Sequence, residues 1–222
     1  MVNEAVTVCI DFADKLQNVI SNKNKLHRWL IVTHESDFDT ISLCKKYNIE
    51  YICSKRVFDN ASFAKGRAIN DGLAHLNKTD WLLHLDADQK LPDNFNTVIE
   101  TECKNKNLLY GCYRTDEQHN SLDRGQHTAR ITKTTSRKLK IQKKKCILPI
   151  GYFQLWHSVI CKTYEEQSTM GDKDDIIFMN KWITSDKNQT HIMNMSTIDV
   201  SGTQGHYLGH YIGIRNVSKN NA

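Results

Sequence analysis

The sequence predicts an α/β fold in which a mostly parallel sheet is flanked by helices on both faces. Strand-like apolar segments alternate with segments of helical spacing through the first 85 residues, an order typical of parallel sheets. The fourth strand-like segment, Trp81–Leu85, runs directly into two aspartates, Asp86 and Asp88. Open α/β sheets bind ligands at the carboxyl ends of their strands, so the main candidate site lies there.

The first half of the chain supplies the parallel part of the sheet. Its other strands are rich in β-branched and apolar residues and are predicted at 5–12, 29–32 and 51–53. Its helices follow apolar spacings of three and four residues and are predicted at 14–20, 38–44 and 61–76. Ser36 or Asp37 is expected to cap the second helix.

The second half predicts a smaller, antiparallel addition. A strand is expected at 108–113, a polar loop at 116–130, an antiparallel pair at 146–150 and 157–161, and a helix with acids at its start at 174–183. We expect one domain over residues 1–222, with halves 1–107 and 108–222. That domain could be the N-terminal part of a longer protein.

Composition narrows the class of protein. Apolar residues make up 39% and charged residues 25%, as in ordinary globular domains, and the net charge of +5 suits an anionic ligand such as a nucleotide. The seven scattered cysteines form no CxxC pair, which argues against a zinc site or a disulfide framework. Without a signal peptide, or an apolar run of ~18 residues, we expect a cytoplasmic protein with no transmembrane segment.

The Asp86-Ala87-Asp88 motif has two interpretations. Paired carboxylates suit hard cations such as Mg²⁺ and Mn²⁺, which keep open positions for phosphate oxygens. The alternative is a turn with solvated acids, because Asp-x-Asp also occurs by chance. An EF-hand does not fit, since Lys90 and Leu91 stand where that loop needs an oxygen ligand and a glycine.

Four segments together carry a family resemblance: FAKGRAINDGLAHL, WLLHLDADQKLP, GDKDDIIFMNKW and GHYLGH. Their order and spacing resemble the GT-A class of nucleotide-sugar glycosyltransferases, of the inverting family 2 type. They are most similar to the small glycosyltransferase domains that large algal DNA viruses, the chloroviruses, use on capsid glycans. The resemblance covers most of the chain, and residues 63–92 are its specific part.

The resemblance implies a GT-A fold and a metal-dependent activity. A sugar would pass from a UDP-sugar, such as UDP-glucose, to a hydroxyl of a glycan or glycoprotein acceptor, with Mn²⁺ or Mg²⁺ as cofactor. A viral protein of this kind would act in the host cytoplasm. The donor sugar stays open between glucose, galactose and rhamnose.

The resemblance also assigns the metal site and the phosphate contact. It implies that Asp88 binds the metal directly and that Asp86 contacts the metal or the sugar nucleotide. His206, preferred to His210, would be a third metal ligand. Lys65, at the start of a helix, would contact phosphate, although a surface lysine is the alternative.

The same resemblance assigns a general base and the residues that would line the nucleotide, Asp11, Phe12 and Thr33, called here the nucleotide wall. Asp11 and Phe12 would line the nucleotide, and Thr33 stands near where many relatives have an aspartate that binds uracil. In the acidic pair, Asp175 would be the general base and Asp174 would help to bind the acceptor. The alternative for that pair is charge at a helix N-terminus, and the nearby Asp172 could be confused with either acid. Residues 151–156 would line the donor sugar and acceptor.

Three other functions are compatible with parts of the sequence. A nucleotidyltransferase would use similar ligands, but no Gly-rich triphosphate signature follows the first strand. A nucleic-acid-binding domain could use the basic run from Lys133 to Lys145, but that run lacks interleaved aromatics, so no nucleic acid is expected. The third is an inactive, glycosyltransferase-like binding domain.

Overall fold

The structure, a computed structural model, describes residues 4–59, 62–122, 149, 151–166, 174–183 and 189–201. Its first half contains β1 (Glu4–Val8), α1 (Ala13–Asn18), a 3-10 helix (Ile20–Lys25), β2 (Arg28–Thr33), α2 (Phe38–Tyr47), β3 (Glu50–Cys53), β4 (Phe58–Asp59), β5 (Ser62–Phe63), α3 (Lys65–His75), β6 (Trp81–Leu85), β7 (Gln89–Lys90) and α4 (Phe95–Glu102). The second half contains β8 (Leu109–Thr115), β9 (Phe153–His157), α5 (Asp174–Asn180) and β10 (Thr190–Asp199).

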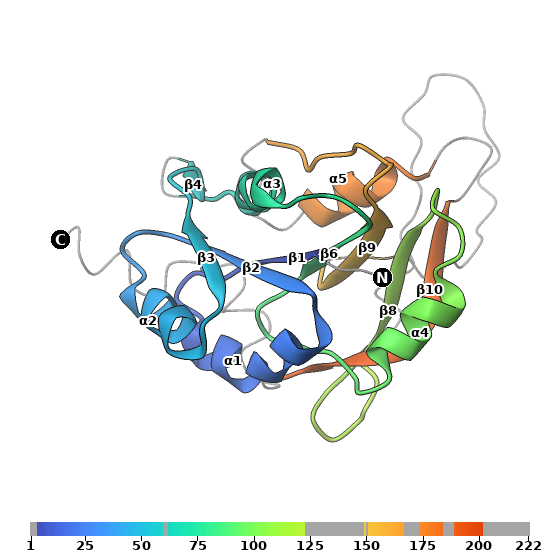
Figure 1. Ribbon diagram of the computed structural model, residues 1–222, viewed down its shortest axis with the longest axis horizontal. Coiled ribbons are helices and arrows are strands. Elements are labelled where there is room, and N and C mark those ends of the chain that lie inside the picture. The colour runs from blue at the N-terminus through green and yellow to red at the C-terminus, as the bar shows by residue number, and fades with distance from the viewer. Residues whose placement is uncertain are drawn as a thin grey trace.

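Eight of these strands form one sheet in the order β3-β2-β1-β6-β9-β8-β10-β7 (Figure 1). The strands β3, β2, β1 and β6 are parallel, as predicted for the first half. From β6 the sheet continues into β9 and β8 through antiparallel pairs, then to β10 by a parallel pair and to β7 by an antiparallel one. The predicted α/β class, a mostly parallel sheet with an antiparallel part from the second half, is confirmed.

Helices cover both faces of the sheet. Figure 1 shows α1 and α2 on one face and α3 and α5 on the other, with α4 beside β10. Alternate residues of β1 enter different cores, Ala5 on one face and Val6 on the other. Gly72 lets α3 lie close to the sheet, because a Cβ there would stand 2.6 Å from Val6 and 2.7 Å from Val32. No helix in the described segments is both long and apolar enough to cross a membrane.

Several element boundaries differ from the sequence predictions. The first strand ends at Val8 rather than at residue 12, because the chain turns at Asp11, which has a φ of 56°. The helix expected over 61–76 begins at Lys65, after the short hairpin of β4 and β5. The strand expected at 157–161 is wrong: β9 ends at His157, where the Ile160 N–H turns back to bond the His157 carbonyl.

Candidate active site

Asp86 and Lys65 form an ion pair at the carboxyl end of β6. The Lys65 Nζ donates to Asp86 Oδ1 at 2.6 Å, and the two side chains are 14% and 13% exposed. Burial acts to lower the pKa of Lys65, but the negative charges of Asp86, Asp175 and Asp88 outweigh it and raise that pKa. A charged ammonium group therefore stands among three carboxylates. The structure thus brings together the predicted phosphate contact and the predicted strand-end acid.

Asp88 lies deeper than Asp86. It is 1% exposed, and its Oδ1 accepts a hydrogen bond from Gln89 Nε2 at 2.9 Å. Its backbone carbonyl accepts from the Val200 N–H at 2.9 Å, just beyond β10. The alternative of a turn with solvated acids therefore does not fit, because both aspartates are enclosed by the fold.

His84 is a functional candidate that the sequence reasoning missed. It precedes Asp86 by two residues, so both side chains lie on the same face of the chain as it leaves β6. His84 is fully buried, and its Nε2 lies 3.4 Å from Asp86 Oδ1. Burial, aided by the charge of Lys65, lowers the pKa of His84 to about 3, so the ring is neutral. The sequence did contain a signal for this residue, because a histidine is unusual inside an apolar segment such as 81–85.

Asp175, in the first turn of α5, lies beside Gly151. Its Oδ2 occupies the space that a Cβ on Gly151 would need, and Gly151 has a φ of 28°. Its Oδ1 accepts from the Ile176 N–H at 2.8 Å. Burial raises the pKa of Asp175 to about 6, against the opposing charge of Lys65. A carboxylate with this pKa is mostly ionised at pH 7 and still basic enough to take a proton efficiently.

Asp174 has a different environment from its neighbour. It is 1% exposed, and its Oδ2 accepts from the Gly66 N–H at 2.7 Å. Gly66 is the second residue of α3, and the N–H groups of a first helical turn have no partner within the helix. Asp174 therefore caps the helix that carries Lys65. The sequence reasoning placed Asp174 with Asp175 in the catalytic pair and missed this long-range contact.

The predicted nucleotide wall is organised by Asp37. The Asp37 Oδ2 accepts from the Asp11 N–H at 2.9 Å and from the Thr33 hydroxyl at 3.1 Å, and Oδ1 accepts from the Thr40 N–H at 3.1 Å. Thr33 is fully buried, and the Asp37 carboxylate joins it, at the end of β2, to the turn after β1. Phe12 is partly buried and packs against the core. Of the two caps proposed for α2, Asp37 is confirmed.

Asp86 and Asp88 are the carboxylates at the end of β6 that could hold a metal ion together with other ligands. Within those residues, no group of three or more His, Cys, Asp or Glu could hold a metal ion. Two carboxylates still fit Mg²⁺ or Mn²⁺, because such ions are commonly bound by one or two carboxylates together with substrate phosphates. His206 and His210 lie outside the described residues, as do Asp172 and the run from Lys133 to Lys145.

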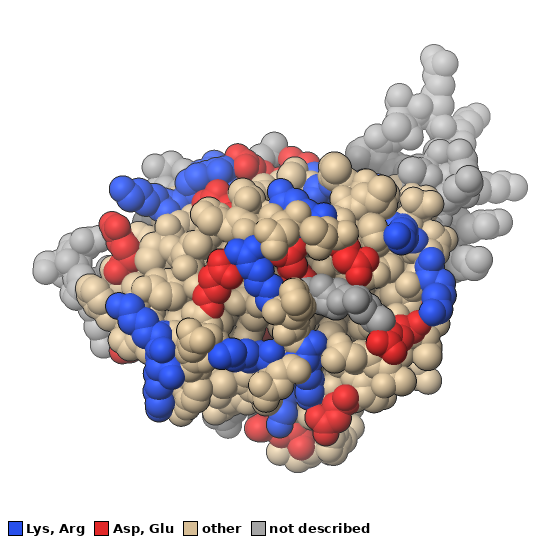
Figure 2. All heavy atoms as spheres, viewed as in Figure 1, with Lys and Arg blue, Asp and Glu red and all other residues tan. Residues whose placement is uncertain are grey.

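Charged side chains of both signs are mixed on one face of the protein. On the face in Figure 2, basic and acidic side chains are interspersed. Arg28 also pairs with Glu4 and Glu50 at the amino ends of β1, β2 and β3, which is the opposite edge of the sheet from the candidate site. That face offers no basic stripe of the kind that tracks a nucleic-acid backbone.

Comparison with known proteins establishes the fold. No protein-family model matches the chain, and no curated protein matches its sequence. Among solved structures, the chain is similar to a mycobacterial protein, with a TM-score of 0.62 and 13% identity over 89% of this chain and 66% of that one. This chain thus spans just under two thirds of the length of the mycobacterial chain.

Two nucleotidyltransferase-like structures match over nearly their whole length. A Bacillus anthracis protein designated a glucose-1-phosphate thymidylyltransferase, in complex with sucrose, has a TM-score of 0.53 and 12% identity, over 97% of this chain and 96% of that one. The 4-diphosphocytidyl-2C-methyl-D-erythritol synthase of Anaerococcus prevotii has a TM-score of 0.52 and 13% identity, over 90% of each chain. At such identities the likeness shows the fold alone.

Proposed function

We propose that this protein is a metal-dependent, inverting glycosyltransferase that moves a sugar from a UDP-sugar to a hydroxyl of a glycan acceptor. The observation that carries the proposal is that Asp175 interacts electrostatically with both Lys65 and Asp86. One carboxylate can then serve the acceptor, while the lysine and the strand-end acids serve the diphosphate of the donor. An acid with a pKa of about 6 in such a place is a candidate for proton transfer.

On the donor side, Lys65 would bind the diphosphate through its ammonium group. Asp86 and Asp88, with His206 as the predicted third ligand, would hold Mn²⁺ or Mg²⁺. The bound ion would supply Lewis-acid stabilisation of the departing diphosphate, which is worth several kcal/mol in other enzymes. Asp11 and Phe12 would border the nucleoside, while Thr33 would support that wall through Asp37 rather than touch the base.

On the acceptor side, Asp175 would accept the proton of the attacking hydroxyl. The acceptor oxygen forms its bond to the anomeric carbon as the bond from that carbon to the diphosphate oxygen breaks. Because attack comes from the face opposite the leaving group, a single displacement inverts the anomeric configuration. Proton transfer to a positioned carboxylate typically contributes about 10²–10⁴-fold to the rate.

Nucleotidyl transfer is the second candidate, since two proteins of that class share the fold over nearly their whole length. Two features of the turn after β1 oppose it. The turn, residues 9–12, reads Cys-Ile-Asp-Phe and contains no glycine that would let the backbone approach a triphosphate. The Asp11 N–H is also already bonded to Asp37.

The two candidates are separated by their products. The purified protein would be incubated with UDP- and GDP-sugars and Mn²⁺ or Mg²⁺, and separately with nucleoside triphosphates and sugar 1-phosphates. We expect release of UDP, or sugar transfer, in the first set and no pyrophosphate in the second. NMR of the linkage formed should show the anomeric configuration opposite to that of the donor. Pyrophosphate release, or retention of the donor's configuration, would overturn the proposal.

A further inference from the structure

A buried polar network lies next to Asp175 and takes no part in the chemistry proposed above. Its centre is Gln154, the second residue of β9, which is fully buried and stands opposite His84 in the sheet register. Its second member is Tyr164, which is 2% exposed. Buried polar side chains at such positions are costly unless each finds hydrogen-bond partners, so their contacts indicate what they hold in place.

The Gln154 amide bonds two backbone carbonyls on either side of the Gly151–Asp175 contact. Its Nε2 donates to the Asp175 carbonyl at 3.1 Å and to the Pro149 carbonyl at 3.0 Å. Both N–H groups of the amide are therefore used on the two segments that bring Gly151 against Asp175. The amide oxygen faces the other way and accepts a hydrogen bond from the Tyr164 hydroxyl.

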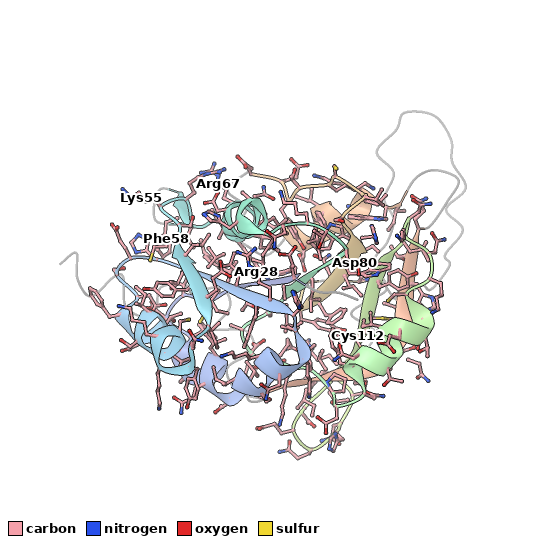
Figure 3. All side chains as sticks on the ribbon, viewed as in Figure 1. Arg28, Lys55, Phe58, Arg67, Asp80 and Cys112 are labelled. Atoms are coloured by element: carbon pink, nitrogen blue, oxygen red, sulfur yellow. The ribbon has the colours of Figure 1, made fainter. Side chains whose placement is uncertain are left out.

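Tyr164 is in turn fixed to α3 and α5. Its backbone exchanges two hydrogen bonds with the side chain of Asn70 on α3, each at 2.9 Å, and its ring stacks on Phe178 of α5 with centroids 3.9 Å apart. Arg67, which projects from α3 in Figure 3, donates from Nε to the Glu166 carbonyl at 2.7 Å and holds the same segment. Because its backbone and its ring are both held by these contacts, the hydroxyl of Tyr164 has a fixed position.

We propose that Gln154, oriented by Tyr164, is the positioning residue that fixes Asp175 for proton abstraction from the acceptor. The inference rests on the proposed function. Gln154 does not touch the reacting atoms. It acts by holding the main chain of Asp175 relative to Gly151 and, through Tyr164 and Asn70, relative to the helix that begins with Lys65. A purely structural network would add stability without affecting the chemical step.

Tyr164→Phe is the sharpest variant, because it removes one hydroxyl and leaves the ring to stack on Phe178. Misplacement of a catalytic group by about 1 Å can cost roughly 10²-fold, so we expect kcat for transfer to fall by roughly 10- to 100-fold with the KM for the donor unchanged. The matched control is Tyr110→Phe. That hydroxyl is also internal, donates to the Asn105 carbonyl at 3.0 Å, and lies on β8 outside this network. We expect it to leave kcat unchanged.

A double-mutant cycle separates positioning from loss of stability. In the Asp175→Asn background, Tyr164→Phe should lower the remaining rate no further, because the group it positions has gone. Gln154→Met, which keeps the length of the side chain and removes its polar atoms, should behave in the same way. Equal effects of Tyr164→Phe and Tyr110→Phe, or a Tyr164→Phe effect that persists undiminished without Asp175, would overturn the inference.

A measurement that does not depend on activity tests the positioning role separately from the proposed function. The Ile176 N–H donates to Asp175 Oδ1, so its amide resonance in an NMR spectrum reports where that carboxylate lies. Both Tyr164→Phe and Asp175→Asn should shift this resonance, and Tyr110→Phe should not. If no nucleotide sugar reacts, the proposed function fails. If the resonance does not move in Tyr164→Phe, the positioning role fails.

Discussion

The carboxylate of Asp175 lies against the backbone of Gly151, in the space that any side chain at residue 151 would occupy. The φ of 28° at Gly151 adds a second reason for glycine, because other residues rarely adopt positive φ. Two segments that lie 24 residues apart in the sequence can thus pack together only because residue 151 is a glycine. The position of Asp175, the proposed base, depends on the lack of a side chain at residue 151.

Gly151→Ala should therefore displace Asp175 and lower the transfer rate by at least roughly 10-fold, since small displacements of a reacting group are expensive. Donor binding should persist, because Lys65 and Asp86 are held by other elements. Steady-state kinetics and calorimetry with UDP and Mn²⁺ check the two parts. A variant that transfers sugar at the wild-type rate would contradict the contact as a determinant of activity.

Asp174 should act on stability more than on chemistry. Removing a helix-capping acceptor typically costs about 0.5–2 kcal/mol of unfolding free energy, so Asp174→Ala should be destabilised by that amount. Asp174→Asn should lose less, because its amide oxygen can still accept the Gly66 N–H. Urea denaturation measures both, with Asp37→Ala, which removes the cap of α2, as the comparison. A loss of transfer in Asp174→Asn equal to that in Asp175→Asn would return Asp174 to the catalytic pair.

The raised pKa of Asp175 has a kinetic consequence. Transfer should decline as the pH falls through about 6, where this carboxylate takes up a proton and can no longer act as the base. Asp175→Asn should lose roughly 10²–10⁴-fold in transfer and keep its affinity for donor and Mn²⁺. The remaining transfer rate of Asp175→Asn should not decline in this way as the pH falls through about 6. A pH–rate profile of both proteins makes the comparison.

The same pKa has a consequence for stability. Because the pKa is raised from 3.8 to about 6 on folding, the folded protein binds more protons than the unfolded chain between these pH values. Ionisation of Asp175 therefore lowers the free energy of unfolding as the pH rises through that window, by up to roughly 3 kcal/mol. Asp175→Asn cannot ionise, so it should gain stability relative to wild type between pH 4 and pH 7. If the difference in unfolding free energy between Asp175→Asn and wild type stayed constant from pH 4 to pH 7, the raised pKa of Asp175 would be contradicted.

The proposed metal ligands can be tested by calorimetry. Asp88→Asn keeps an oxygen that can accept from Gln89 but loses the charge, so it should fold and lose metal-dependent binding of UDP. His206→Ala should weaken the dependence on Mn²⁺ and leave binding of UDP without metal nearly intact. Unchanged metal-dependent affinity in Asp88→Asn would remove it from the site. If only His210→Ala has the effect expected of His206→Ala, then His210 is the third ligand.

The strand-and-acid pattern around Asp86 was readable from sequence because it is local. An apolar run that ends in acids predicts both β6 and the edge at which ligands bind, and helical spacing places Lys65 near the start of α3 and Asp175 near the start of α5. By contrast, the bond between Asp174 and Gly66 joins residues 108 positions apart, and no local pattern indicates it. Thr33 has the right chemistry for a base contact, but Asp37 already engages its hydroxyl.

The second half was harder to predict for a related reason. β10 is ten residues long, yet its sequence THIMNMSTID mixes polar and apolar residues without clear alternation. Its burial is decided by its neighbour β8 and by a register shift between Ile192 and Ser196. Strands whose pattern depends on a distant partner are visible only once that partner is placed.

Five consecutive register pairs join β6 to β9, from Trp81 opposite His157 to Leu85 opposite Phe153. Because β6 belongs to the first half and β9 to the second, a hinge motion between the halves would have to open a ladder in the middle of the sheet. Breaking several buried backbone hydrogen bonds at once is costly, because each group loses a partner away from water. Closure of two lobes along this boundary would break that ladder, so we expect any ligand at the carboxyl end of β6 to bind over a rigid floor.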